Sequence, residues 1–331
     1  MGFERNYQIR IPSNQIINKH IIFLCAAQVS LSWVIGFTDA EGCFRISIIK
    51  NKNSKGKALP LSVRLYFQIG LHRKDEAILK LIRSELGVGK IDRGRKYSSE
   101  LQVSSFKDSE RLIDYFEKYP LITQKLADYL LFKQAFELIK NKEHLTMKGL
   151  KKLVAIKASI NWGLPDGLKK AFPDVDPVKR LNVVHKETID PNWLAGFTSG
   201  EGSFLVRLFD SSHNITGSQV QLRFQITQQS RDLVLMENIV KYFSCGNISK
   251  RGDIIDIHVT KFSDITEKII PLFEKYPIIG VKKENFYDFC KVAELMKKKA
   301  HLTKEGLEQI REIRKNMNSY RESYQDEADL V

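Results

Sequence analysis

An internal duplication constrains this chain more than any other feature of its sequence. The segment WVIGFTDAEGCF at residues 33–44 returns as WLAGFTSGEGSF at 193–204, an offset of 160 residues. Further on, LYFQI, FEKYP and AFELIKNKEHLTMKGL return as LRFQI, FEKYP and VAELMKKKAHLTKEGL, each at an offset of 157. Matches in the same order and at nearly constant spacing indicate two tandem copies of one structural unit. We predict copies at 31–161 and 191–318, a linker at 162–190, an N-terminal extension at 1–30 and an acidic C-terminal tail at 319–331.

Each copy changes between helical and strand periodicity. After Glu41, apolar residues occupy positions 44, 46 and 48, and the residues between them are mostly polar. A similar alternation returns at 62–69 and 219–226. It is typical of an antiparallel sheet that has helices on one face and leaves a polar, basic face open. The expected fold class is α+β. We expect helices at 75–86, 126–140, 232–243 and 283–298, and Thr146 and Thr303 as caps of a last helix in each copy.

The charge of the chain favours a polyanionic partner. Lys and Arg number 53 against 39 Asp and Glu, a formal net charge of +14, and nucleic acid is the commonest partner for such an excess. A basic protein with a merely solvated surface is the alternative. The Arg, Gln, Ser and Tyr content of the open sheet face favours nucleic acid, because Arg and Gln form paired hydrogen bonds to base edges and a two-stranded ribbon fits the major groove.

The cysteines and the N-terminus limit the cellular setting. None of the 4 cysteines forms a CxxC pair or has zinc-ligand spacing, so we expect a reducing, intracellular compartment rather than a disulfide scaffold. The apolar run at 21–27 is too short to span a bilayer, and the first residues do not follow the pattern of a signal peptide. We therefore expect no membrane partner.

Two Glu–Gly pairs follow stripes of small residues. Gly36 and Ala40 are four residues apart, as are Gly196 and Gly200 in the second copy. Small residues at that spacing allow two helices to pack backbone to backbone. Glu41 and Glu201, at the helix ends, would then meet. Two adjacent carboxylates are unfavourable without a cation, and oxygen ligands suit Mg²⁺, which serves in two-metal phosphodiester hydrolysis. The alternative is a pair of surface acids at helix ends, which the duplication and the basic sheet disfavour.

The segments VIGFTDAEG at 34–42 and LAGFTSGEG at 194–202 resemble the two motifs of the monomeric LAGLIDADG homing endonucleases. The resemblance covers most of the chain, from about residue 31 to 318. It implies two αββαββα halves related by a pseudo-twofold axis, with the motif helices at their interface and the antiparallel sheets forming a saddle over DNA.

The resemblance also assigns roles to particular residues. The sixth motif position differs between the copies, Asp39 against Ser199, which suggests asymmetry rather than loss of activity. Lys125 and Lys282, which align between the copies, have a simpler alternative as solvated surface residues, because a Lys before a helix is more often solvated than catalytic. By position, the implied roles are metal binding by the carboxylates of Glu41 and Glu201 and the carbonyls of Ala40 and Gly200, water positioning by Gln68 and Gln225, and stabilisation of phosphate charge by Lys125 and Lys282.

The resemblance implies a Mg²⁺-dependent, monomeric endonuclease that hydrolyses one phosphodiester per strand of a long, asymmetric DNA target and leaves 3′ overhangs. An intron RNA maturase that binds its host RNA is the alternative, and retention of both acids favours the nuclease. An intein is disfavoured because the chain has no N-terminal nucleophile. Relatives of this kind suggest a fungal mitochondrial origin. The expected base-reading residues are Arg45, Ser47, Ile49, Arg64, Tyr66 and Gln68 in the first copy, and Leu205, Arg207, Phe209, Gln221, Arg223 and Gln225 in the second.

Overall fold

The computed structural model describes residues 29–50, 61–94, 97–183 and 188–318. Both sequence copies lie in one compact unit, which begins at Leu31. The predicted tail at 319–331 and nearly all of the predicted extension at 1–30 lie outside the described residues.

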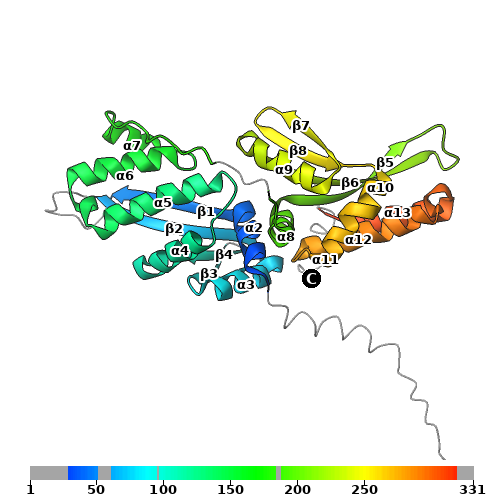
Figure 1. Cartoon of the computed structure of the whole chain (residues 1–331), viewed down its shortest axis with the longest axis horizontal. Helices are drawn as coiled ribbons and strands as arrows, with labels where there is room; N and C mark the ends of the chain where they lie inside the picture. The colour runs from blue at the N-terminus through cyan, green and yellow to red at the C-terminus, as the bar shows by residue number, and fades with distance from the viewer. Residues whose placement is uncertain (1–28, 51–60, 95–96, 184–187, 319–331) are drawn as a thin grey trace, which may run out of the picture. The chain divides into compact units, whose positions relative to one another are not determined.

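The two copies follow the same order of helices and strands, except where one helix of the first copy is replaced by three short helical segments in the second (Figure 1). The first comprises α2 (Leu31–Glu41), β1 (Gly42–Lys50), β2 (Leu61–His72), η2 (Arg73–Asp75), α3 (Glu76–Leu86), β3 (Lys90–Arg93), β4 (Ser98–Val103), α4 (Phe106–Lys118), α5 (Lys125–Lys140), η3 (Glu143–Leu145) and α6 (Met147–Ser159). The second comprises α8 (Pro191–Glu201), β5 (Gly202–Asp210), β6 (Ser218–Gln229), η4 (Ser230–Asp232), α9 (Leu233–Phe243), β7 (Asn247–Arg251), β8 (Ile254–Val259), α10 (Phe262–Asp264), η5 (Ile265–Ile269), α11 (Ile270–Lys275), α12 (Val281–Lys297), η6 (Ala300–Leu302) and α13 (Lys304–Lys315).

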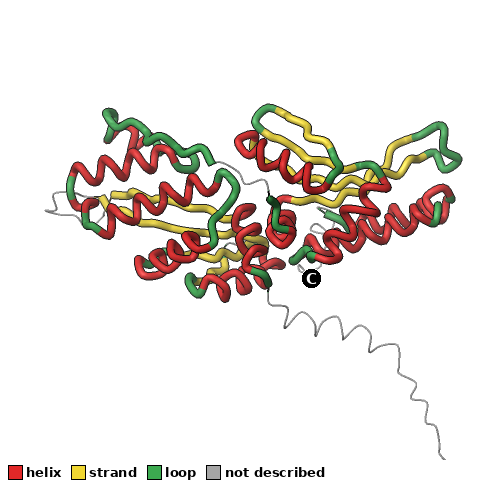
Figure 2. Tube along the Cα trace, in the orientation of Figure 1, coloured by secondary structure: helices red, strands yellow, loops and turns green. Residues whose placement is uncertain are grey.

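Each copy forms its own four-stranded antiparallel sheet (Figure 2). The strand order is β1-β2-β4-β3 in the first copy and β5-β6-β8-β7 in the second. The first hairpin of each copy pairs in matching register, with Phe44 opposite Phe67 and Phe204 opposite Phe224. The alternating residues are buried on one face and exposed or half-buried on the other, as the periodicity predicted. The α+β class and the pair of related αββαββα halves are therefore confirmed.

Aromatic side chains fill the core between each sheet and its helices. Phe44 packs against Phe67, Phe116, Tyr129 and Phe132 with ring centroids 5.0–5.7 Å apart. The second copy repeats this cluster around Phe204. Because each large ring removes much apolar surface from water, the cluster anchors the helices to the sheet. The FEKYP repeat thus supplies a core phenylalanine in both copies.

The predicted caps of the last helices are confirmed. Thr146 accepts a hydrogen bond from Gly149 N and Thr303 accepts one from Gly306 N, both at 3.0 Å. A Cβ at Gly149 would lie 2.0 Å from the carbonyl oxygen of Glu143. The repeated LTxxGL segment therefore combines an N-cap with a glycine that the preceding turn requires.

The segment between the copies is packed rather than loosely extended. It contains α7 (Asp166–Ala171) and buries Leu168 and Phe172. Val178 N donates to the Ala155 carbonyl at 3.2 Å, and Arg180 forms an ion pair with Asp128 on α5. Residues from this segment thus lie against α5 and α6, while 184–187 lie outside the described residues.

Within the described ranges, no helix combines the length and apolar character needed to cross a membrane. The three cysteines in these ranges, Cys43, Cys245 and Cys290, are free thiols.

Candidate active site

Helices α2 and α8 touch backbone to backbone. A Cβ at Gly36 would lie 1.9 Å from the Trp193 carbonyl oxygen, and a Cβ at Gly196 would lie 2.0 Å from that of Trp33. No side chain fits at either position without separating the helices. The small-residue stripes predicted from the sequence therefore form the interface between the copies.

This interface brings Glu41 and Glu201 together at the ends of their helices. Both side chains are half-buried. Across the interface, a Cβ at Gly200 would lie 3.3 Å from Glu41 Oε1, so the Glu41 carboxylate lies against the end of α8. Burial, followed by the charge of Glu41, raises the pKa of Glu201 to about 7. Close approach of the two acids thus makes the ionised pair costly without a cation.

The side chains of Lys125 and Lys282 reach the ends of α2 and α8, where the two glutamates lie. Lys125 Nζ donates to the Ala40 carbonyl at 2.9 Å, and Lys282 Nζ donates to the Gly200 carbonyl. Burial lowers the pKa of both lysines, that of Lys282 to about 8, against the attraction of the nearby carboxylates. The structure therefore places the basic pair at the two carbonyls named from the sequence, rather than in solvent.

Groups from both copies line one pocket at this interface. The pocket, of about 370 Å³, is lined by Ala40 and Lys125 from the first copy and by Glu201, Gln228 and Asp232 from the second. On the other side of the interface, Glu41 exerts the strongest attraction on Lys282. Each glutamate is thus combined with the carbonyl and lysine of the other copy.

Gln228 is a site residue that the sequence interpretation missed. Its Nε2 donates to Glu201 Oε1 at 3.1 Å. The expected water-positioning residues point instead to acids on the sheet, Gln68 to Glu100 at 2.7 Å and Gln225 to Asp256 at 2.9 Å. The register of β5 and β6 could have revealed Gln228, because Gly202 pairs with Ile226 and Gln228 follows two residues later. At the offset of 157, its counterpart is Leu71.

The sixth motif position ties each motif helix to the segment before α5 or α12. Asp39 accepts hydrogen bonds from Ile122 N, Thr123 N and Thr123 Oγ1, and from Trp193 Nε1 across the interface at 2.8 Å. Burial raises the pKa of Asp39. Ser199 accepts a hydrogen bond from Ile279 N at 3.2 Å. Both residues therefore hold the segment that precedes α5 or α12, and only Asp39 does so with a carboxylate.

The twelve residues expected to read bases all lie on the exposed or half-buried faces of the sheets. Arg45 lies over the Tyr66 ring at 4.8 Å, and Arg207 lies over the Phe209 ring at 5.1 Å. Such stacking holds a guanidinium in place while leaving donors free. Polar residues of β4 and β8 share these faces although the sequence interpretation did not include them: Glu100, Gln102, Asp256 and His258.

The oxygen atoms at the interface suit a hard divalent cation. They are the carboxylates of Glu41 and Glu201 and the carbonyls of Ala40 and Gly200, and Mg²⁺ and Ca²⁺ both prefer oxygen ligands. Burial, followed by the charge of Glu41, raises the pKa of Glu201, and a cation bound beside this carboxylate would favour its ionised form. Within the described ranges, no group of three or more His, Cys, Asp or Glu residues is placed to hold a metal.

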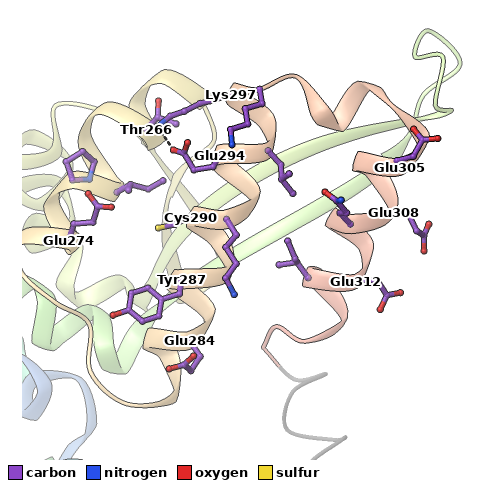
Figure 3. A pocket seen from close by; sticks show the side chains of 17 residues that line it. Thr266, Glu274, Glu284, Tyr287, Cys290, Glu294, Lys297, Glu305, Glu308 and Glu312 are labelled. Carbon is purple, nitrogen blue, oxygen red and sulfur yellow. Dashed lines mark hydrogen bonds and ion pairs between the residues drawn. The ribbon is translucent and has the colours of Figure 1, made fainter. Parts of the chain in front are cut away.

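A larger hollow, of about 1230 Å³, lies between α12 and α13 (Figure 3). Tyr287, Cys290 and several glutamates line it, and it contains none of the interface residues. The corresponding hollow of the first copy, between α5 and α6, is lined in part by Val178 and Leu181 of the linker. Both hollows are lined by glutamates and lysines, but neither includes a residue of the motif helices α2 and α8.

Comparison with known proteins matches the model of the LAGLIDADG endonuclease family to residues 34–136 and 194–293. The chain is 41% identical over 330 residues to the probable intron-encoded endonuclease 3 of Neurospora crassa, covering 93% of this chain and 61% of that protein. It is 38% identical to the probable intron-encoded endonuclease 2 of the same fungus, covering 88% and 66%. The chain thus spans less than two thirds of the length of these curated relatives.

Solved structures show the same likeness. The I-SmaMI LAGLIDADG homing endonuclease bound to cleaved DNA matches with a TM-score of 0.83 and 43% identity, covering 88% of this chain and 98% of that one. The LAGLIDADG meganuclease I-CpaMI bound to uncleaved DNA matches with a TM-score of 0.84 and 44% identity, covering 87% and 99%.

Proposed function

This chain belongs to the LAGLIDADG endonuclease family, and we propose from that premise that it is a site-specific endonuclease. It hydrolyses one phosphodiester in each strand of double-stranded DNA and leaves 3′ overhangs. The observation that carries this proposal is the meeting of Glu41 and Glu201 at the α2–α8 interface, beside Lys125 and Lys282. DNA-bound relatives with over 40% identity support it.

Glu41, Glu201 and the carbonyls of Ala40 and Gly200 would hold the divalent ion, which we take to be Mg²⁺. When bound, such an ion lowers the pKa of a bound water and stabilises charge on the phosphate. A structure of I-SmaMI with an uncleaved DNA target was obtained with calcium ions, which supports a divalent-ion site in this family.

The protein's own side chains neutralise charge on the attacked phosphates and orient the carboxylate of Glu201. The ammonium groups of Lys125 and Lys282 offset charge that develops on the attacked phosphates, and their partial burial strengthens that interaction. Gln228 fixes the orientation of the Glu201 carboxylate through its hydrogen bond. Each site is thus assembled from both copies and needs their interface intact.

The open sheet faces would bind a long DNA target. Their arginines and the net charge of +14 attract the phosphate backbone, while Arg, Gln and Tyr side chains contact base edges. Because the two faces carry different residues, the target is asymmetric and one protein molecule binds it. Relatives named for the ND4 and cox1 introns support a role in fungal mitochondria.

Substitution of the two acids tests the proposal. Glu41→Gln and Glu201→Gln should each abolish double-strand cleavage of a randomised duplex library with Mg²⁺, because each removes one carboxylate of the pair. Retention of selected duplexes on a filter should change little. The exposed Glu237→Gln on α9 is the matched control and should cut as the unaltered protein does. Normal cutting by either interface variant would refute the assignment.

A further inference from the structure

Two aspartates, one in each copy, accept hydrogen bonds from the backbone of the other copy. Asp232 Oδ1 accepts a hydrogen bond from Gln124 N in the first copy at 2.7 Å. Asp75 Oδ1 accepts one from Val281 N in the second copy at 2.8 Å. The offset of 157 relates Asp75 to Asp232 and Gln124 to Val281, so the exchange is reciprocal.

Both hydrogen bonds fall where a helix begins. Gln124 is the N-cap of α5, and Val281 is the first residue of α12. The first turn of a helix has backbone N–H groups without helical partners and a partial positive charge, which a carboxylate stabilises. In both copies the next residue is the active-site lysine, Lys125 or Lys282. Each aspartate therefore holds the backbone just before the lysine of the other copy.

The surroundings restrict where these carboxylates lie. Asp232 is 2% exposed, and Gln124 is 4% exposed. Gly280, with a φ of +86°, would place a Cβ 2.5 Å from Asp75 Oδ1, so a larger residue there would displace the carboxylate. The equivalent residue in the first copy is Thr123, whose hydroxyl bonds Asp39 instead. The residue before the helix start thus differs between the copies, yet in both copies an aspartate of the other copy accepts a hydrogen bond from the backbone at that point.

We propose that Asp232 and Asp75 are positioning residues: Asp232 sets Lys125, and Asp75 sets Lys282, each from across the interface. The inference rests on the proposed endonuclease function. Displacement of a catalytic group by about 1 Å lowers the reaction rate by about a hundredfold, so a small shift at the start of the helix would slow cleavage. Docking of the two copies and completion of each active site are thereby coupled.

The proposal has a signature that a general structural role lacks. Lys125 lines the pocket that holds Glu201, whereas Lys282 responds most strongly to Glu41. Loss of Asp232 should therefore slow the cut made at the Glu201 site, and loss of Asp75 should slow the cut made at the Glu41 site. The two variants should affect opposite DNA strands.

The experiment measures both strand cuts in one single-turnover reaction on a duplex labelled differently on each strand, with excess protein and Mg²⁺. Asp232→Ala and Asp75→Ala should each slow one strand, and not the same one, by about tenfold to a hundredfold. DNA affinity should change less than about twofold, because the sheet faces are untouched. Asp232→Asn and Asp75→Asn keep an acceptor oxygen and should restore most of the rate.

Ser105→Ala is the matched control. It removes the N-cap of α4, where Ser105 accepts from Asp108 N at 3.0 Å, without touching the interface, and should leave both strand rates equal to those of the unaltered protein. Equal slowing of both strands by either alanine variant, or unchanged rates in both, would overturn the positioning role. If an alanine variant fails to fold, its asparagine variant decides: a small residual slowing confined to the assigned strand, relative to the unaltered protein, supports the positioning role, and an equal effect on both strands overturns it. Absence of cleavage by both the unaltered protein and Ser105→Ala would overturn the proposed function and this inference together.

Discussion

The two motif glutamates occupy the same sequence position but different surroundings. Glu201 accepts a hydrogen bond from Gln228, whereas the counterpart of Gln228 in the first copy is Leu71, whose side chain cannot donate one. Burial and the charge of Glu41 raise the pKa of Glu201 to about 7. The acid that is best oriented is therefore also one that is costly to ionise when no cation is bound.

This cost should appear as a pH-dependent effect on stability. Because the folded pKa of Glu201 lies above its ordinary 4.5, its ionisation opposes folding fully above pH 7 and not at all below about 4.5. In EDTA, Glu201→Gln should raise the free energy of unfolding by up to about 3 kcal/mol at pH 8, with the gain falling as pH drops from 7 toward 4.5. Urea unfolding at several pH values measures this. A gain that does not vary with pH would contradict the prediction, and Glu237→Gln serves as the control.

Some site residues could be predicted from sequence and others could not. Glu41, Glu201, Lys125 and Lys282 follow from motif and repeat alignment, because each lies at the end of a recognisable helix. Asp75 could not be predicted, since its partner Val281 is 206 residues away and meets it only when the copies dock. Gln228 was missed in the sequence because the register of β5 and β6, and not the hydrophobic periodicity, places it beside Glu201.

At the scale of elements, the contact between α2 and α8 depends on glycine. Gly36→Ala should destabilise the protein by about 3 kcal/mol, because its Cβ would meet the Trp193 backbone, which cannot move away as a flexible side chain can. Urea unfolding of the full chain measures the loss. Gly167→Ala on α7 is the control: nothing lies within 4 Å of its Cβ, so the helix should gain about 0.5–1 kcal/mol. Equal stability of both variants would contradict backbone contact.

Helices and strands were predictable where the hydrophobic period was long, as in β1, β2 and α5. The packing of the linker on α5 and α6 was not, because α7 is short and proline-rich sequence has no sustained period. The second copy also departs from the first where α4 is replaced by α10, the π-helical η5 and α11. Pro271 lies at the start of α11 and lacks a backbone N–H, which removes one helical hydrogen bond there.

At the scale of the whole molecule, the two open sheet faces are not equivalent, and Arg223 illustrates the difference. In the described part of the chain, no acceptor meets its Nε, although the atom is shielded from solvent. A buried donor without a partner is costly, so a partner supplied by bound DNA would be favourable.

Arg223→Ala should therefore relax base choice at one target position by about 1–3 kcal/mol if Arg223 contacts a guanine. Selection of cleaved sequences from a randomised library measures this preference. A uniform loss of affinity for all sequences, with reduced salt dependence, would make Arg223 a phosphate contact instead.

The two active sites should also cut at unequal rates, and Gln228 provides the test. Gln228→Leu makes the Glu201 site resemble the Glu41 site, where Leu71 stands. Loss of the hydrogen bond that orients Glu201 should slow one strand by about tenfold to a hundredfold in strand-resolved single-turnover cleavage, while the other strand is unaffected. The exposed Gln309→Leu on α13 is the control. Because Gln228, Glu201 and Lys125 line one pocket, the slowed strand should be the one that Asp232→Ala slows. If the two substitutions slowed opposite strands, the glutamate of one copy would not work with the lysine of the other, and the composite sites would have to be redrawn within single copies.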